Sequence, residues 1–314
     1  MLTTPVLRGL KQQTGSEVHF LTKKAFASIV EHNANVDKVH TLTDDINDVI
    51  RDLKHEDYDA IVDLHHNLRS KRIKIALGKP STSFDKLNVQ KWILVNFHID
   101  RLPPVHIVDR YLETVTHLGV KKDESGLDIF LPAASQVDVK KQFGFDPGQY
   151  CSIVIGAAHQ TKCMTVDQIR QLCNELKMAV ILLGGKEEID KANAILAGVS
   201  HSQVKSAVGA MNILQSASII QQSGPVITHD TGMMHIAAAL KKPQVVVWGN
   251  TVPQFGMYPY YGNEGVKWTS FEITGLHCRP CSKLGFERCP KGHFKCMLEH
   301  DVRAIATAAL QFQE

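Results

Sequence analysis

Three short segments of this 314-residue chain join an expected strand end to polar residues that suit a phosphate-bearing ligand. The most informative is PVITHDTGMMHIAAAL, in which an apolar strand runs into Asp230, Thr231 and Gly232. Gly232 lets a ligand approach the backbone, and the free N–H groups of the helical turn that follows suit a diphosphate. Asp230 is also a good helix N-cap, so a plain capped βα turn, with His235 partly buried on the helix, is the alternative explanation.

Two further loops carry groups that can complete such a site. In SIVIGAAHQTKCMTVDQI, Lys162 follows an expected strand, where its ammonium can reach the same diphosphate. In VILLGGKEEIDKA, a carboxylate of Glu187 or Glu188 lies just past a strand and can accept hydrogen bonds from ribose hydroxyls. A solvated lysine and acids favoured by a helix dipole are the alternatives. Together the three strand ends indicate one nucleotide-diphosphate site.

Four cysteines near the C-terminus form a second group with chemical potential. Cys278 and Cys281 have the C-x₂-C spacing of a chelating pair, and Cys289 and Cys296 follow. Four thiolates can enclose a tetrahedral zinc ion, so a structural zinc site is one interpretation. Six residues separate the second two cysteines, which is not the standard spacing, and reduced thiols that pack within a loop are the alternative.

Alternating strands and helices must position all of these residues. This alternation predicts an α/β fold with parallel sheets wrapped by helices. The expected strands are 16–22, 36–42, 58–66, 151–158, 178–185, 224–230 and 243–250. The expected helices are 2–13, 24–33, 44–56, 107–120, 166–177, 187–199, 212–223, 231–242 and 300–313. Residues 66–104 are basic and aromatic, and the part through Pro80 is expected to be irregular.

Composition limits the class of protein. A chain of this length with 44% hydrophobic residues favours two domains. The formal net charge of +3 is spread along the chain, so no nucleic-acid partner is expected. The sequence has neither a signal-peptide pattern nor a run of about 18 apolar residues, and we expect a cytoplasmic protein.

The order and spacing of these segments resemble glycosyltransferase family 9, the ADP-heptose:lipopolysaccharide heptosyltransferases. The family signature D-[ST]-G-x-x-H-x-A stands here at residues 230–237, and Gly249 and Thr251 stand where the family has a Gly-x-Thr turn. Lys162 matches the phosphate-contacting lysine of the family, and Glu188 matches its ribose-contacting acid. The resemblance extends over essentially the whole chain and is strongest from 150 to 260.

The resemblance implies a GT-B fold, in which two Rossmann-like doubly wound domains face each other across a cleft. It implies an acceptor-side domain at residues 1–135, a linker at 136–149, a nucleotide-sugar domain at 150–298 and a terminal helix at 299–314. The acceptor-side region would lie in the basic stretch, where Arg69 and Lys71 meet anionic groups of the acceptor. A solvated basic face is the alternative for these two residues.

The implied activity is inverting, metal-independent transfer of heptose from ADP-heptose to the lipid A-core of lipopolysaccharide. No cofactor is implied for catalysis. Because the acceptor is a lipid, peripheral association with the inner membrane is also expected. Lys162 and Asp230 are the expected catalytic residues. The expected donor-binding residues are Lys162, Glu188, Asp230, Thr231, Gly232 and His235.

Two departures from the family pattern qualify this expectation. The family lysine is usually followed by a basic residue, tryptophan and proline, whereas this chain has Cys163, Met164 and Thr165. Family members also begin with an apolar strand and a Ser-x-Gly-Asp loop ahead of the helix at which this sequence starts. The aspartate of that loop is the family's proposed general base, so no residue here takes that role. The alternatives are therefore a catalytically silent nucleotide-sugar-binding remnant, or another GT-B enzyme such as a sugar-nucleotide 2-epimerase.

Overall fold

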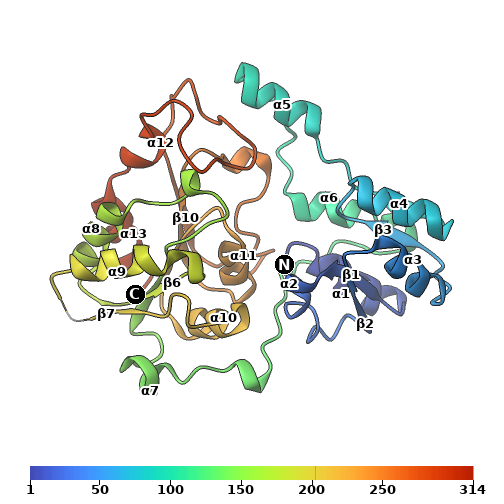
Figure 1. Ribbon diagram of the computed structural model, residues 1–314, viewed down its shortest axis with the longest axis horizontal. Helices are drawn as coiled ribbons and strands as arrows, with labels where there is room; N and C mark the ends of the chain where they lie inside the picture. The colour runs from blue at the N-terminus through green and yellow to red at the C-terminus, as the bar shows by residue number, and fades with distance from the viewer. Residues whose placement is uncertain (202, 314) are drawn as a thin grey trace. The chain divides into compact units, whose positions relative to one another are not determined.

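The computed structural model describes residues 1–201 and 203–313, and the chain divides into two compact units (Figure 1). The first unit comprises Met1–Leu87 and Val105–Phe130. The second comprises Asn88–Pro104 and the chain from Leu131 onward. Residues 88–104 thus group with the second unit, although they fall within the expected first domain of residues 1–135.

The second unit is built on one sheet of six parallel strands in the order β10-β9-β8-β5-β6-β7. Renumbered within the unit, this order is 6-5-4-1-2-3, which confirms the expected doubly wound arrangement. The order reverses between β5 and β8, and ligands of such sheets bind beyond the carboxyl ends of the strands at this point. The strands are β5 Tyr150–Val154, β6 Ala179–Leu183, β7 Val204–Ser206, β8 Val226–His229, β9 Gln244–Trp248 and β10 Trp268–Glu272.

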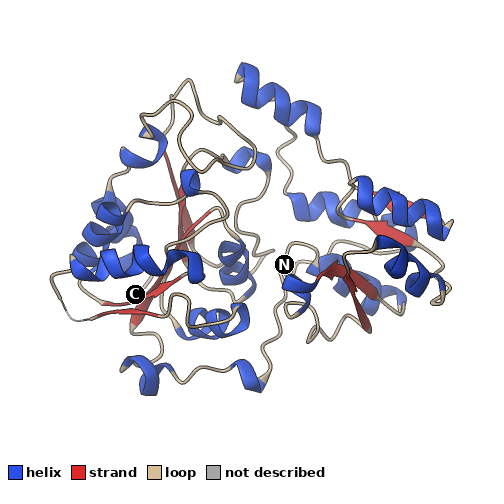
Figure 2. Cartoon of the chain, in the orientation of Figure 1, coloured by secondary structure: helices blue, strands red, loops and turns tan. Residues whose placement is uncertain are grey.

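Helices bury both faces of this sheet, as Figures 1 and 2 show. One face, with Ile153 and Leu182, packs against α8 Val166–Leu176, α9 Ile189–Ala197 and α13 Val302–Leu310. The other face, with Val154 and Ile181, packs against α10 Ile213–Gln222 and α11 Gly232–Ala239. Because successive side chains of a strand point to opposite faces, an uninterrupted apolar run is required to fill both cores.

Two strands of this sheet were not predicted from the sequence. β7 has only three residues and includes the exposed Lys205, and the side chains of β10 are all only half-buried. Both strands lie at the edges of the sheet, where one side is solvated and the apolar signal is weak.

The first unit contains two separate two-stranded parallel sheets, β1-β2 and β3-β4. Helix α3 and helix α4 cover a small core that includes Val49, Leu53 and Ile73. The elements are α1 Thr4–Thr14, β1 His19–Lys23, α2 Lys24–Ala27, β2 Lys38–Leu42, α3 Ile46–Lys54, β3 Ile61–Asp63, α4 Leu68–Leu77, β4 Ser81–Ser83 and α6 Ile107–Glu113.

Three sequence-based expectations for the first unit are wrong. The helix expected over 107–120 ends at Glu113, and only the short η1, Thr116–Leu118, follows it. The stretch from residue 66 to Pro80 is not irregular, since α4 occupies most of it. A reciprocal capping box between Asn67 and Ser70 begins α4, and Gly78, with a positive φ of 64°, ends it. The helix expected over 24–33 ends at Ala27, because the backbone continues through turns such as Ile29 N–H to Phe26 C=O rather than a regular helix.

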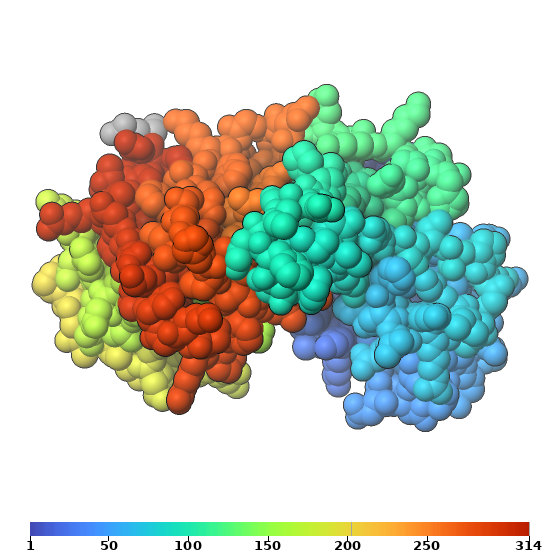
Figure 3. All heavy atoms as spheres, turned by 90° about the horizontal axis from the view of Figure 1, so that it is seen from above, coloured from blue at the N-terminus to red at the C-terminus, as the bar shows by residue number. Residues whose placement is uncertain are grey.

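Short elements complete the chain. Helix α5, Asn88–Phe97, stands out in teal beside the segment that contains Lys283 (Figure 3), and Lys283 donates a hydrogen bond to Asn88. None of the described helices is long and apolar enough to cross a bilayer. The remaining short elements are η1 Thr116–Leu118, η2 Ala133–Ser135, α7 Val139–Phe143, η3 Gln160–Lys162, η4 Lys186–Glu188, η5 Pro253–Phe255 and α12 Lys295–Leu298.

Candidate functional site

An ion pair between Lys162 and Asp230 lies at the point where the strand order of the second unit reverses. Lys162 ends η3, which follows β5, and Asp230 directly follows β8. Lys162 Nζ lies 2.7 Å from Asp230 Oδ2, and the two side chains are only 13% and 12% exposed. Thr251 donates from Oγ1 to the same oxygen at 2.9 Å. The structure therefore places a cation, held by a carboxylate, where a doubly wound sheet binds its ligand.

Helix α11 begins beside this ion pair. Thr231 is its N-cap, with Oγ1 accepting a hydrogen bond from Met233 N at 3.1 Å. The alternative in which Asp230 caps this helix is therefore wrong, and the Asp230 carboxylate pairs with Lys162 instead. A Cβ placed on Gly232 meets no atom within 4 Å, so the backbone at the start of α11 is open to a ligand.

Glu188 lies against the loop that follows β5. Its Oε2 accepts a hydrogen bond from Gly185 N at 2.7 Å, which holds the carboxylate at the end of β6. A Cβ on Gly156 would lie 2.4 Å from Glu188 Cδ, so a side chain at position 156 would displace this carboxylate from its place. Glu187, the other acid considered, is exposed. Of the two acids, Glu188 is thus the one brought next to the β5 loop.

Two buried histidines lie near this ion pair, one within α11 and one at the end of β8. His235 lies within α11 and is 6% exposed. His229, the last residue of β8, is fully buried and accepts a hydrogen bond from Met164 N at its Nε2, 2.9 Å away. Burial lowers the pKa of His229 to about 3, so this imidazole is neutral at physiological pH. The sequence analysis missed His229, which ties the end of β8 to the loop that carries Lys162.

Lys191 also holds this loop and was missed. Its ammonium donates to Ile155 O at 2.9 Å and to Met164 O at 2.7 Å, at the two ends of the segment. Burial lowers the pKa of Lys191. Its position in α9, where a lysine usually faces solvent, gave no sequence signal.

The residues after β9 pack directly on the Lys162 loop. A Cβ on Gly249 would lie 2.3 Å from Thr161 O, so the close approach of these two backbones requires glycine. Thr161 donates from Oγ1 to Asn250 Oδ1 at 3.0 Å. Arg279 donates to Gly249 O and Thr251 O, each at 2.8 Å, and pairs with Glu272. Arg279 was not predicted, and it fixes the turn that carries Thr251.

The three residues that depart from the family pattern have structural roles here. Cys163 and Met164 are buried, and Met164 joins the core on the α8 face of the sheet. Thr165 caps α8 through a reciprocal capping box with Gln168. Core packing and a helix cap therefore anchor this end of the Lys162 loop.

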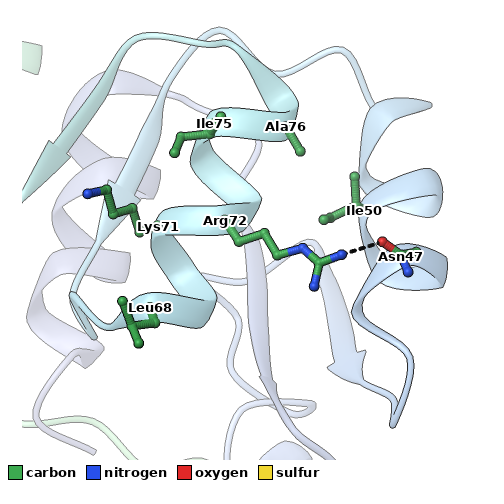
Figure 4. Close-up of a pocket in the computed structure, with 7 residues that line it drawn as sticks. All are labelled: Asn47, Ile50, Leu68, Lys71, Arg72, Ile75 and Ala76. Atoms are coloured by element: carbon green, nitrogen blue, oxygen red, sulfur yellow. Dashed lines mark hydrogen bonds between the residues drawn. The ribbon is translucent and has the colours of Figure 1, made fainter.

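The predicted acceptor residues Arg69 and Lys71 both lie on α4 of the first unit, where their side chains are exposed. Lys71 lines an open groove between α3 and α4 that also contains Arg72 and Asn47, which are joined by a hydrogen bond (Figure 4). The groove holds none of the predicted donor-binding residues. Both residues are thus carried by a helix rather than by a loop.

The four cysteines of the C-terminal cluster are free thiols in the structure. Burial, and then the neighbouring thiols of Cys281 and Cys289, raise the pKa of Cys296 to about 12. Cys278 Sγ lies 3.6 Å from His293 Nε2. Within residues 1–201 and 203–313, no three of the four sulfurs come within 4.8 Å of one another. Zinc binding by this cluster stays a prediction, which elemental analysis of protein purified without chelator would test.

Comparison with known proteins places the chain in a family. The model of glycosyltransferase family 9 (heptosyltransferase) matches residues 46–281. Lipopolysaccharide heptosyltransferase 2 of Salmonella typhimurium is 33% identical over 89 residues, which cover 27% of this chain and 25% of that protein. Lipopolysaccharide heptosyltransferase 1 of Campylobacter coli is 22% identical over 258 residues, or 75% of each chain. The chain thus aligns with about a quarter of the first relative and three quarters of the second.

Solved structures share the fold. A glycosyltransferase of family 9 from Veillonella parvula superposes with a TM-score of 0.79 at 18% identity, covering 99% of this chain and 93% of that one. The ADP-heptose LPS heptosyltransferase II of E. coli gives 0.75 at 16% identity, covering 99% and 94%. These likenesses identify the α/β fold as the GT-B type. The match of the family model over residues 46–281 shows that the chain belongs to glycosyltransferase family 9.

Proposed function

We propose that this chain transfers heptose from ADP-heptose to the lipid A-core of lipopolysaccharide, with inversion and without a divalent metal ion. The observation that carries the proposal is the Lys162–Asp230 pair beside the open start of α11, at the carboxyl ends of β5 and β8. Membership of a heptosyltransferase family supplies the donor and acceptor classes.

The main chemical task of this site is to stabilise the negative charge of the leaving group. When the acceptor hydroxyl attacks the anomeric carbon, the bond to the nucleoside diphosphate breaks and the diphosphate carries away negative charge. The Lys162 ammonium and the free N–H groups at the start of α11 would stabilise that charge. Asp230 would keep the ammonium in place because it accepts a hydrogen bond from it, and Thr251 would hold Asp230 because it donates to the same carboxylate oxygen. Preorganised donors of this kind each contribute about 3 to 4 kcal/mol to lowering a barrier.

The other donor-binding residues have assigned tasks in this proposal. Glu188, beside Gly156, would accept hydrogen bonds from the ribose hydroxyls. Thr231 and Gly232 would face the diphosphate, and His235 would support α11 from its buried side. Arg69 and Lys71 would meet anionic groups of the acceptor. We assign no residue of this chain as the general base.

Donor binding can be tested without turnover. ADP-heptose at about 100 times its Kd should stabilise the protein by about 2.7 kcal/mol and raise its Tm. Lys162→Ala should abolish the rise because the diphosphate loses its cation. The matched control is Lys205→Ala, an exposed lysine on the edge strand β7. A rise that persists in Lys162→Ala would remove Lys162 from the site.

Transfer is measured separately, with ADP-heptose and a heptose-free lipid A-core acceptor in the presence and absence of EDTA. Transfer that EDTA leaves unchanged is the expected result. Donor binding without transfer would instead identify a silent nucleotide-sugar-binding protein. Transfer that stops with EDTA and returns with Mg²⁺ would contradict the metal-independent mechanism.

A further inference from the structure

Four side chains of the first unit form a cluster that the proposed transfer reaction does not use. His19 begins β1, His40 is the third residue of β2, and Glu56 and Tyr58 lie between α3 and β3. The strand pairing sets His19 opposite Lys38 and Leu21 opposite His40. Side chains two positions apart on a strand share a face, so the two histidines are diagonal neighbours on one face of the sheet.

The distances between the possible ligand atoms suit a small cation. His19 Nδ1 lies 3.3 Å from His40 Nε2 and 3.8 Å from Glu56 Oε2. His40 Nε2 lies 3.9 Å from Glu56 Oε1. Ligands bound to tetrahedral zinc at about 2.0 to 2.2 Å lie about 3.3 to 3.6 Å from one another. Small side-chain rotations would therefore bring the two imidazole nitrogens and one Glu56 carboxylate oxygen to coordination distance.

A second carboxylate orients one of these ligands. His19 Nε2 lies 2.9 Å from Glu17 Oε1. A carboxylate at this distance accepts a hydrogen bond from Nε2–H, which leaves the Nδ1 lone pair facing the cluster, as in the carboxylate–histidine pairs of metal sites. The Tyr58 hydroxyl lies 3.0 Å from His19 Nδ1 and 3.3 Å from His40 Nε2, so an oxygen lies close to both imidazole nitrogens.

The surroundings of the three side chains permit entry of an ion. The side chains of His19, His40 and Glu56 are 8%, 12% and 21% exposed. Lys38 pairs with Glu56 Oε1 and is 52% exposed, so its ammonium can move into solvent when a cation takes its place.

We propose that His19, His40 and Glu56 bind a divalent transition-metal ion, with Zn²⁺ as the expected occupant and an oxygen as the fourth ligand. Two imidazole nitrogens with one carboxylate suit zinc rather than magnesium or calcium, which prefer oxygen ligands. The ion would tie β1, β2 and the segment after α3 together. His19 is at the amino end of β1, whereas ligands of parallel sheets bind at carboxyl ends, so the site would stabilise the fold and take no part in transfer.

The test is Co²⁺ binding to the full, untagged, metal-free chain, with bound metal measured after equilibrium dialysis. His40→Ala and Glu56→Gln should each bind about one metal ion fewer per chain than the wild type. His32→Ala, which changes an exposed histidine, is the matched control and should bind as the wild type does. Any metal held by the C-terminal cysteines contributes equally to all variants.

Lys38→Met keeps the proposal testable if the first two variants fold poorly. Removing the ammonium frees Glu56 Oε1, so this variant should bind Co²⁺ more tightly than the wild type. Equal metal content in the wild type, His40→Ala and His32→Ala would overturn the proposal and leave a hydrogen-bonded cluster with no metal. Weaker binding in Lys38→Met would also contradict it.

Discussion

Buried polar residues organise the loop that presents Lys162. Asp230 pairs with the ammonium and Thr251 donates to the same Asp230 oxygen, while His229 and Lys191 hold the backbone of the loop at Met164. None of these contacts joins neighbours in the sequence. Each contact depends on a residue that follows or covers a different strand. Removing one partner should therefore shift Lys162 from its position in the site.

The neutral state of His229 predicts how stability depends on pH. Its pKa is about 3 in the folded protein, below the ordinary value of 6.5, so the unfolded chain binds the extra proton between these values. Stability contributed by this residue is therefore fully present above pH 6.5 and is lost as the pH falls. The slope is about 1.4 kcal/mol per pH unit.

His229→Gln removes this titration and keeps a side chain that can accept from Met164 N. Urea unfolding at several pH values should show a free-energy difference between the wild type and His229→Gln that shrinks as the pH falls from 6.5. His32→Gln, at an exposed position, is the control. Parallel stability curves for the wild type and His229→Gln over this range would refute the assignment.

At the scale of elements, two glycines at the ends of strands and helices are required for different reasons. Gly249, which follows β9, must be glycine because Thr161 O lies where its side chain would be, whereas Gly232, which begins α11, has open space around it. One glycine serves packing within the protein, and the other leaves room for a ligand. The two can be separated by experiment.

Gly249→Ala should lower the free energy of unfolding by about 1 to 3 kcal/mol, because its methyl group forces the β9 turn away from η3. Gly232→Ala should leave the free energy of unfolding nearly unchanged and weaken the binding of ADP-heptose. Denaturant unfolding and titration calorimetry on the same two variants measure both quantities. Equal loss of stability in the two variants would contradict this division of roles.

At the scale of the whole molecule, α5 and a neighbouring loop expose several large apolar side chains. Val89, Trp92 and Phe97 are 67%, 56% and 58% exposed, and Leu284, beside the basic Lys283, is 60% exposed. Apolar side chains next to positive charge suit the headgroup region of an anionic bilayer. If the peripheral membrane association expected from the sequence occurs, we expect it to involve α5.

Trp92→Glu should reduce co-sedimentation with vesicles that contain anionic phospholipid several-fold, because it removes an inserted ring and adds a repelled charge. Phe26→Glu is the matched control, since Phe26 is 52% exposed in the first unit and its replacement should leave vesicle binding unchanged. Equal vesicle binding by the wild type and both variants would exclude α5 as the contact.

The sequence by itself determined the α/β class, the second-unit elements with strong apolar signals and the family. Fully apolar strands such as 178–185 can only be buried on both faces, and the signature at 230–237 depends on local spacing. The short edge strands β7 and β10 and the helix α4 escaped detection because their apolar patterns are weak.

Only the tertiary structure decided which polar residues meet. Lys162 and Asp230 are 68 positions apart, and Arg279 reaches the β9 turn from 28 residues away. The order of the strands brings such residues together, and spacing along the chain cannot encode that order. The same reason explains why His229, Lys191 and the cluster of His19, His40 and Glu56 gave no sequence signal, whereas Thr231 and Gly232, which act through local helix geometry, did.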